Sequence, residues 1–227
     1  MDGIIIINKP KGITSHDVIY KVRKKLNIKK VGHTGTLDPN ATGVLPILIG
    51  KGTKLSQYLT NHDKIYEAVL KLGEKRSTGD VEGEVTEVKS VNVNQNIREV
   101  LTTFIGKQTQ IPPMHSAIKI NGKKLYEYAR KGITIEVPPK EIEIYSIELL
   151  NINEEEKEII FKVHCGKGTY IRTLCEDIAE KLGTVGYMKD LCRIKVGNFD
   201  IKDSITIEDL DNEEIVLKNL IKEDIFK

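Results

Sequence analysis

The chain has 227 residues, of which 39% are hydrophobic and 30% charged, and its formal net charge is +2. This composition is typical of a soluble globular protein and excludes a disordered chain, because Ile, Val and Leu occur throughout. The longest apolar runs, 3–7 and 44–49, are far shorter than the roughly 20 residues of a membrane-spanning helix.

The start of the chain and its cysteines favour a cytoplasmic protein. Met1 and Asp2 lead directly into a strand-like run, without the basic and apolar regions of a signal peptide. Cys165, Cys175 and Cys192 are odd in number and lack CxxC spacing, which favours reduced thiols without a metal.

Charge is distributed unevenly along the chain. Residues 1–60 hold ten Lys and Arg against three acids, a net charge of +7. Residues 200–227 hold four lysines against nine acids, a net charge of −5. A basic end suits a polyanion, because each neutralised phosphate releases counterions. The alternative is that 21–30 is only the solvated face of an amphipathic helix, and charge alone leaves both open.

The first half of the chain mixes short strands with helices. A buried strand is predicted at 3–8, followed by a turn and by a helix at 15–26 with Ser15 as its N-cap. Residues 31–43, rich in Gly and Thr, follow as a loop. The next predicted elements are a strand at 44–49, a short helix at 53–59, a hairpin of 65–72 with 84–88 through a turn at 80–83, and a helix at 97–104.

The second half begins with 108–123, which lacks periodicity and is interpreted as an inserted functional loop. The mixture of elements, without strict βαβ alternation, predicts an α+β fold with a mixed, largely antiparallel sheet flanked by helices. We expect a single domain over 1–227 with an acidic tail at about 200–227. The remaining predicted elements are a helix at 125–130, strands at 133–137, 141–149 and 159–165, a helix at 170–182, a strand at 185–196, and short helices beginning near 207 and 213.

The loop 32–43 offers one imidazole, His33, and one carboxylate, Asp38. From the local sequence alone, an aspartate before proline is more often a turn former than a catalyst. A metal site would need more ligands, and His62-Asp63 is the only other compact candidate pair. No serine lies in a GxSxG frame and the glycines do not form a P-loop, which disfavours a serine nucleophile and a nucleotide site.

A second informative segment is 166–172, where a strand, a glycine turn and a helix start would place backbone N–H groups as an anion site. Arg172 would lie in the first helical turn, where the helix dipole disfavours a cation, so we expect a carboxylate partner. The alternative is an exposed arginine on a helix face. Tyr66 and Tyr170 are by default half-buried tyrosines.

Five motifs follow one another along the chain. They are NKPKGITS at 8–15, GHTGTLDP with ATGVLP at 32–46, YEA at 66–68, QIPP with SA at 110–117, and GTYIRTL at 168–174. Their order and spacing, from about residue 2 to about residue 199, resemble the TruB family of tRNA pseudouridine synthases. The block 32–46 is the most specific, because other pseudouridine synthase families place their aspartate in an Arg-Leu-Asp type of context that is absent here.

The resemblance implies a pseudouridine synthase fold and isomerisation of uridine 55 in the T-arm of tRNA. The N1–C1′ bond breaks, the base rotates and C5 joins C1′, so no cofactor is expected. By resemblance, Asp38 acts at the anomeric carbon and Arg172 pairs with it, which would lower the pKa of the carboxylate and orient it. Tyr66 would stack on the base as a third catalytic residue. The implied substrate-binding residues are His33, Tyr66, Tyr170 and Leu191.

The same resemblance implies that tRNA is the partner, bound through its T-arm stem-loop by the basic residues 1–60 and by the inserted RNA-binding loop 108–123. The uridine would be flipped out at a cost of about a few kcal/mol. We expect no membrane association, no obligate protein partner and a monomer. Family members usually carry a C-terminal PUA domain. This chain has none up to Lys227, from which weaker tRNA binding is expected.

Three departures from the family pattern stand outside the catalytic set. They are His115 for a usual tyrosine, Gly166 for a common serine and Cys192 for a frequent arginine. Two alternative functions are a non-catalytic RNA-binding or tRNA-folding protein on the same scaffold, and a guide-RNA-directed relative of the archaeal and eukaryotic kind. The first is disfavoured by the retained Asp38, Tyr66 and Arg172, and the second requires a further RNA-binding domain and protein partners.

Overall fold

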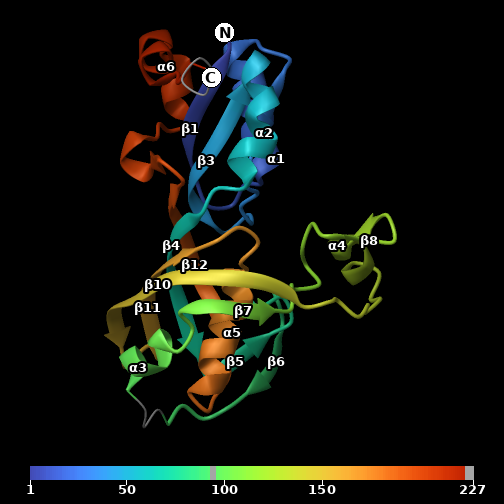
Figure 1. Cartoon of the computed structure of the whole chain (residues 1–227), viewed down its shortest axis with the longest axis vertical. Coiled ribbons are helices and arrows are strands. Elements are labelled where there is room, and N and C mark those ends of the chain that lie inside the picture. The colour runs from blue at the N-terminus through green and yellow to red at the C-terminus, as the bar shows by residue number, and fades with distance from the viewer. Residues whose placement is uncertain (93–95, 223–227) are drawn as a thin grey trace. The chain divides into compact units, whose positions relative to one another are not determined.

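A computed structural model describes residues 1–92 and 96–222 (Figure 1). The chain divides into two compact units, which we name the first unit (1–67 with 191–227) and the second unit (68–190). The strands β4 (Lys64–Leu72) and β12 (Gly186–Val196) each begin in one unit and end in the other. The expected single domain, its inserted loop and the absence of a PUA domain stay predictions.

The first unit is built around an antiparallel pair, β1 (Gly3–Lys9) and β3 (Thr42–Ile49), with Ile5 opposite Ile47. Every residue of β3 after Thr42 is buried, which is why its sequence is a continuous apolar run. On the other side of β3, β12 pairs in parallel, with Arg193 opposite Gly43. Two shorter strands complete this arrangement: β2 (Val31–His33) pairs with β3, and β13 (Phe199–Asp200) pairs with β12.

Helices cover these strands. The helix α1 spans Ser15–Leu26 as predicted, but its N-cap is Thr14, not Ser15. Thr14 and Asp17 form a reciprocal capping box, which leaves the Ser15 hydroxyl available for another segment. Leu59 of α2 (Ser56–Thr60) packs in a buried cluster with the β1 and β3 side chains. The region of the predicted helix 53–59 is a 3₁₀ turn (Gly50–Leu55) followed by α2.

The second unit contains strands in the order β12–β4–β11–β10–β7, with β11 antiparallel to β10 and β10 antiparallel to β7. The helices α5 and α3 lie beside these strands in Figure 1, whereas α4 and β8 are drawn apart from them. The bounds of the elements are β5 (Glu74–Arg76), β6 (Val85–Val88), α3 (Ile97–Thr102), β7 (Gly106–Gln110), β8 (Lys119–Ile120), β9 (Lys123–Lys124), α4 (Leu125–Ala129), β10 (Lys140–Asn153), β11 (Glu158–Cys165) and α5 (Ile171–Lys181).

The predicted α+β class with a largely antiparallel sheet is confirmed, and two predicted elements are wrong. Residues 85–88 pair with β5, not with 65–72, because a separate short strand follows Gly73. Residues 133–137 form no strand, since they belong to the segment between α4 and β10. Residues 108–110, which we assigned to the inserted loop, form the end of β7.

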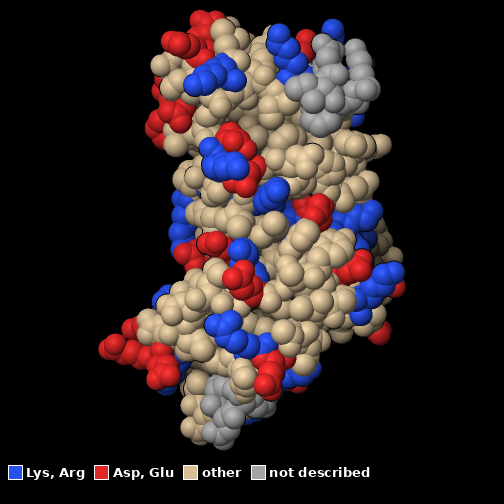
Figure 2. Space-filling model, turned by 60° about the vertical axis from the view of Figure 1, so that its left-hand side comes forward, with Lys and Arg blue, Asp and Glu red and all other residues tan. Residues whose placement is uncertain are grey.

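The C-terminal segment returns to the first unit. It forms a 3₁₀ turn (Glu208–Asp211) and α6 (Glu213–Asn219), and Asp211 forms an ion pair with Lys25 of α1. The last part of the predicted acidic tail, 223–227, lies outside the described residues. On the face shown in Figure 2, basic and acidic side chains are interspersed. Within the described residues, every helix is too short or too polar to cross a membrane.

Candidate active site

Asp38 lies in the connection between β2 and β3. Its carbonyl accepts a hydrogen bond from the Ala41 N–H (3.0 Å), which closes a turn with Pro39 at its second position. Its backbone therefore does form the turn that the Asp-Pro sequence predicted. The Asp38 side chain is half-buried.

Lys9 of the first motif holds this turn through a hydrogen bond to Pro39. It is 0% exposed, and its ammonium donates hydrogen bonds to the carbonyls of Pro10 (2.9 Å), Ile13 (2.8 Å) and Pro39 (3.1 Å). Burial lowers the pKa of Lys9 to about 8, and the nearby Asp38 carboxylate acts in the opposite direction. Asp38 therefore lies within electrostatic reach of a buried cation from its own unit.

Ser15 holds the same loop from α1. Its buried hydroxyl donates to the Leu37 carbonyl (3.2 Å) and accepts from the Leu37 N–H (3.0 Å). Lys9 and Ser15 of motif 8–15 therefore hold motif 32–46 in place through hydrogen bonds. The sequence does not reveal this connection, because the two motifs are separated along the chain.

His33 ends β2 and is half-buried. Its ring meets the His16 ring edge-on at 5.4 Å, and its Nδ1 is buried without a hydrogen-bond partner in the described part of the chain. Burial, and next the charges of His16 and Arg193, lower the pKa of His33 to about 4. The imidazole is therefore neutral at pH 7 and has an unsatisfied polar atom.

Tyr66 and Leu191 are the other expected site residues of the first unit. Each is 8% exposed, and they lie in β4 and β12, respectively. The Thr42 hydroxyl donates to the Leu191 carbonyl (3.4 Å) and thereby joins β12 to the end of the Asp38 loop.

Arg172 lies in the first turn of α5 in the second unit and is 5% exposed, so the alternative of an exposed arginine is wrong. Its guanidinium donates to the carbonyls of Thr78 (3.2 Å) and His115 (2.8 Å). Its Nε lies 4.0 Å from a carboxylate oxygen of Asp80, which is itself buried. A carboxylate partner for this arginine is what the sequence predicts, but from the sequence Asp80 is only the first residue of the predicted turn 80–83.

Tyr170 precedes α5, and its backbone is held by Gln110 of β7. The Tyr170 N–H donates to Gln110 Oε1 (2.8 Å), and Gln110 Nε2 donates to the Tyr170 carbonyl (3.0 Å). One N–H of the expected anion site is therefore already bonded. The Thr173 hydroxyl adds a long contact to the Ile111 carbonyl (3.5 Å), so motif 110–117 holds motif 168–174.

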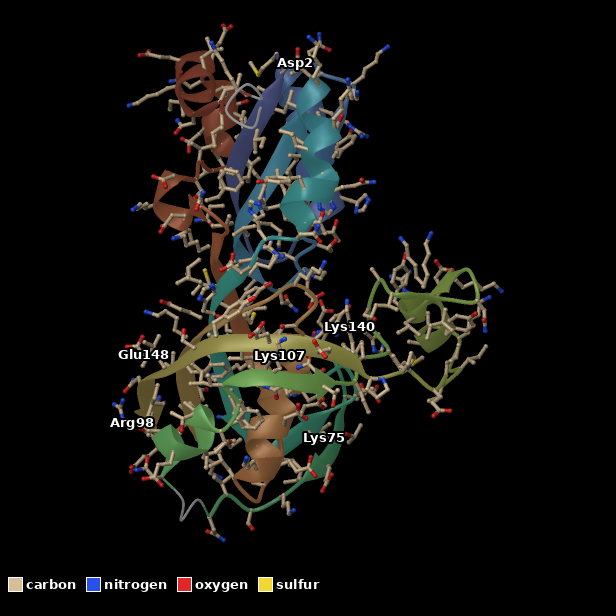
Figure 3. The ribbon with its side chains drawn as sticks, viewed as in Figure 1. Asp2, Lys75, Arg98, Lys107, Lys140 and Glu148 are labelled. Carbon is tan, nitrogen blue, oxygen red and sulfur yellow. The ribbon has the colours of Figure 1, made fainter. Side chains whose placement is uncertain are left out.

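Gly168 is required where β11 turns into α5. Its φ is +80°, and a Cβ there would lie 2.7 Å from the Nζ of Lys140, which is labelled in Figure 3. A side chain at this position would therefore be strained and would displace Lys140. Across 1–92 and 96–222, no group of three or more His, Cys, Asp and Glu side chains is placed to hold a metal.

Comparisons with known proteins identify the family. Residues 23–171 match the model of the TruB family pseudouridylate synthase N-terminal domain, and residues 172–225 match that of the tRNA pseudouridylate synthase B C-terminal domain. The chain belongs to the TruB family. The boundary between the two family models falls at the start of α5, after residue 171. The chain passes between the compact units elsewhere, after residues 67 and 190.

Curated TruB relatives and solved structures agree with this assignment. The tRNA pseudouridine synthase B of Alkaliphilus oremlandii is 54% identical over 92% of this chain and 70% of its own length. That of Clostridium acetobutylicum is 49% identical over 99% of this chain and 77% of its own length. A solved Cbf5-Nop10-Gar1 complex matches with a TM-score of 0.73 and 31% identity over 99% of this chain. The chain spans only 57% of that matched chain, so it corresponds to little more than half of it.

The TruB site residues fall into two groups. His33, Asp38, Tyr66 and Leu191 belong to the first unit, and Tyr170 and Arg172 belong to the second. Their roles, and the pairing of Asp38 with Arg172, stay predictions. The sequence analysis missed the supporting contacts of Lys9, Asp80 and Gln110. Lys9 and Gln110 did lie in the quoted motifs, and their burial is the signal that distinguishes them.

Proposed function

We propose that this TruB protein isomerises uridine 55 of the tRNA T-arm to pseudouridine, with Asp38 as the catalytic carboxylate. The observation that carries the proposal is the position of Asp38 in a loop fixed by buried side chains, beside the buried ammonium of Lys9. A carboxylate at the anomeric carbon can attack C1′, stabilise a cation-like sugar or remove the C2′ proton.

Arg172 is the second catalytic group in this proposal. Two carbonyls already orient its guanidinium, and its three nitrogens form a planar fork suited to a carboxylate. A guanidinium beside Asp38 would keep the acid ionised in a pocket that excludes water. Tyr66 would stack on the target base, and Tyr170 and Leu191 would line its pocket.

The RNA is held by a neutral His33 beside the flipped nucleotide, by the basic residues 1–60 and by the inserted loop. The α1 helix is amphipathic: Val18, Ile19 and Val22 are buried, whereas Lys21 and Lys24 are exposed. Its lysines are therefore accessible to phosphates. We further propose that the protein acts as a cytoplasmic monomer without an obligate protein partner or cofactor.

Tritium release from T-arm RNA labelled at uridine C5 tests this function. The wild type should release tritium, and pseudouridine should map to position 55 of intact tRNA. Asp38→Asn should lower the rate on the order of 10³-fold or more without changing RNA affinity. Asp203→Asn, at an exposed aspartate of the same unit, is the matched control and should keep the wild-type rate.

Two results would contradict the proposal. A wild-type rate for Asp38→Asn would remove the catalytic role of that residue. Normal T-arm binding by the wild type without any pseudouridine would support the non-catalytic scaffold instead.

A further inference from the structure

Arg193 is a buried cation outside the residues that the sequence motifs single out. It lies in β12 two positions after Leu191, so both side chains share a face of the strand. It is 1% exposed and has the largest volume of the fully buried side chains among the described residues. Placing a charge there costs free energy, and a hydrophobic side chain of similar size is often equally or more stabilising. Stability alone therefore does not account for an arginine.

The guanidinium of Arg193 joins the two ends of the Asp38 loop. Its Nε donates to the Val44 carbonyl (2.8 Å), and its Nη2 donates to the Gly35 carbonyl (2.6 Å). Gly35 and Val44 enclose the segment 36–43, which contains Asp38. A rigid fork with several donors can bridge two carbonyls in a fixed geometry, which the single ammonium of a lysine does not reproduce.

Two glycines of the loop lie against Arg193, one against its side chain and the other against its backbone. At Gly35, where φ is +66°, a Cβ would lie 3.2 Å from Arg193 Nη1. At Gly43, where φ is +104°, a Cβ would lie 2.2 Å from the Arg193 carbonyl oxygen. Gly35 therefore leaves room for the guanidinium, whereas Gly43 allows the loop to approach the backbone of β12, as it would for any residue at position 193.

We propose that Arg193 is a positioning residue for the isomerisation: by holding Gly35 and Val44 together, it fixes the segment 36–43 and thereby the Asp38 carboxylate. It acts through the loop and touches no reacting atom. This inference rests on the proposed function. Lys9 and Ser15 bind Pro39 and Leu37 inside the segment, but neither of these bonds joins its two ends. Arg193 supplies that connection.

Arg193→Lys and Arg193→Met test the inference, because the first keeps the charge and the second keeps the apolar bulk. The measurements are the single-turnover rate on T-arm RNA, the Kd for the same RNA, and the Tm. Both variants should lose about 10²-fold in rate, since displacement of a catalytic group by about 1 Å has that effect. Their Kd should remain within about twofold of the wild-type value.

Leu59→Ala is the control for lost stability. Leu59 is fully buried in the same unit, in a cluster with Ile4, Leu48 and the side chain of Val44, so its truncation loosens packing beside the loop while leaving the bond from Arg193 to the Val44 carbonyl available. Its truncation should lower the Tm at least as much as either Arg193 variant, yet keep the wild-type rate at a temperature where the protein is folded. A wild-type rate for both Arg193 variants, or a rate that falls with the Tm across all three variants, would overturn the inference.

Hydrogen exchange separates this inference from the proposed function. The Ala41 N–H is bonded inside the loop, and its exchange should accelerate at least about tenfold in Arg193→Met but not in Leu59→Ala. This holds whatever RNA the protein modifies. A wild type without activity but with this exchange pattern would refute the function while leaving the loop-fixing role in place. Unchanged exchange in Arg193→Met would refute the inference.

Discussion

The Asp38 loop and the start of α5 are held in opposite ways. Around the loop, the buried cations Lys9 and Arg193 donate hydrogen bonds to backbone carbonyls. At the start of α5, Arg172 itself is the donor, and it meets two carbonyls and the Asp80 carboxylate. Asp38 thus lies within electrostatic reach of the buried ammonium of Lys9 in the first unit, whereas Arg172 meets carbonyl oxygens and a carboxylate in the second.

Each unit therefore supplies part of the electrostatic surroundings of its own catalytic candidate. Nearby opposite charges favour the ionised form of a group, and fixed hydrogen bonds set its direction. Lys9, Ser15 and Arg193, all in the first unit, hold the backbone of the loop that carries Asp38. Variants on either side should therefore impair the reaction by separate routes, which makes the comparison open to experiment.

Arg172→Lys should have the largest effect among the tests of the second unit. Lysine keeps the positive charge but cannot reach the carbonyls of Thr78 and His115 together with a carboxylate. We expect the single-turnover rate to fall about 10²-fold, with RNA affinity little changed. Lys181, in the last turn of α5, offers a control: Lys181→Arg should keep the wild-type rate. An active Arg172→Lys would show that charge alone suffices and that the fork is unnecessary.

Asp80→Asn should have a smaller effect, because it removes a charge and preserves the shape. Asp80 also accepts hydrogen bonds from the Thr78 hydroxyl and the Glu82 N–H, which an asparagine oxygen can retain. Loss of the carboxylate near Arg172 should lower the rate about tenfold and lower the Tm. Single-turnover kinetics and thermal melts of the two proteins check both results. A wild-type rate for Asp80→Asn would mean that the two carbonyls orient Arg172 without a charge nearby.

Much of the scaffold could be predicted from local patterns. The helix at 15–26 and the strand at 159–165 follow from periodicity and turn residues, and the structure has α1 and β11 there. The errors have a common cause: strand partners depend on contacts distant in sequence. The pairing of 84–88 was assigned to the preceding long strand, but β5 intervenes.

The candidate site divides in the same way. Asp38 and Arg172 could be found because their motifs resemble a family, whereas their supports could not. Lys9, Gln110 and Arg193 are ordinary polar residues in the sequence, and only burial beside distant carbonyls distinguishes them. Ser15 shows the same limit, because its expected capping role belongs to Thr14.

Gln110→Ala should have a more modest effect on the rate, because it loosens only the backbone before α5. It leaves the N–H and carbonyl of Tyr170 without their partner, at a cost of about 1–3 kcal/mol for a buried group. We expect a lower Tm and a rate reduced severalfold. Gln108→Ala is a matched control on the same face of β7, because Gln108 bonds Phe104 instead of α5. Equal rates for the two variants would remove the link between motif 110–117 and Tyr170.

Lys9→Met should change the pH dependence of stability, which is the smallest effect expected here. The pKa of Lys9 is about 8 in the folded protein and 10.5 unperturbed. Above pH 8 the unfolded chain therefore binds more protons than the folded one, so this group makes stability rise with pH, and the rise should be lost in Lys9→Met. From pH 7 to pH 9 the free energy of unfolding of the wild type should rise by about 1 kcal/mol more than that of Lys9→Met. Urea unfolding of both proteins at each pH measures this. Lys202→Met, at an exposed lysine of the same unit, should follow the wild type. Parallel curves for the wild type and Lys9→Met would mean that the three carbonyls and Asp38 fully offset the burial of the ammonium, so that Lys9 holds the Asp38 loop without a pH-dependent cost in stability.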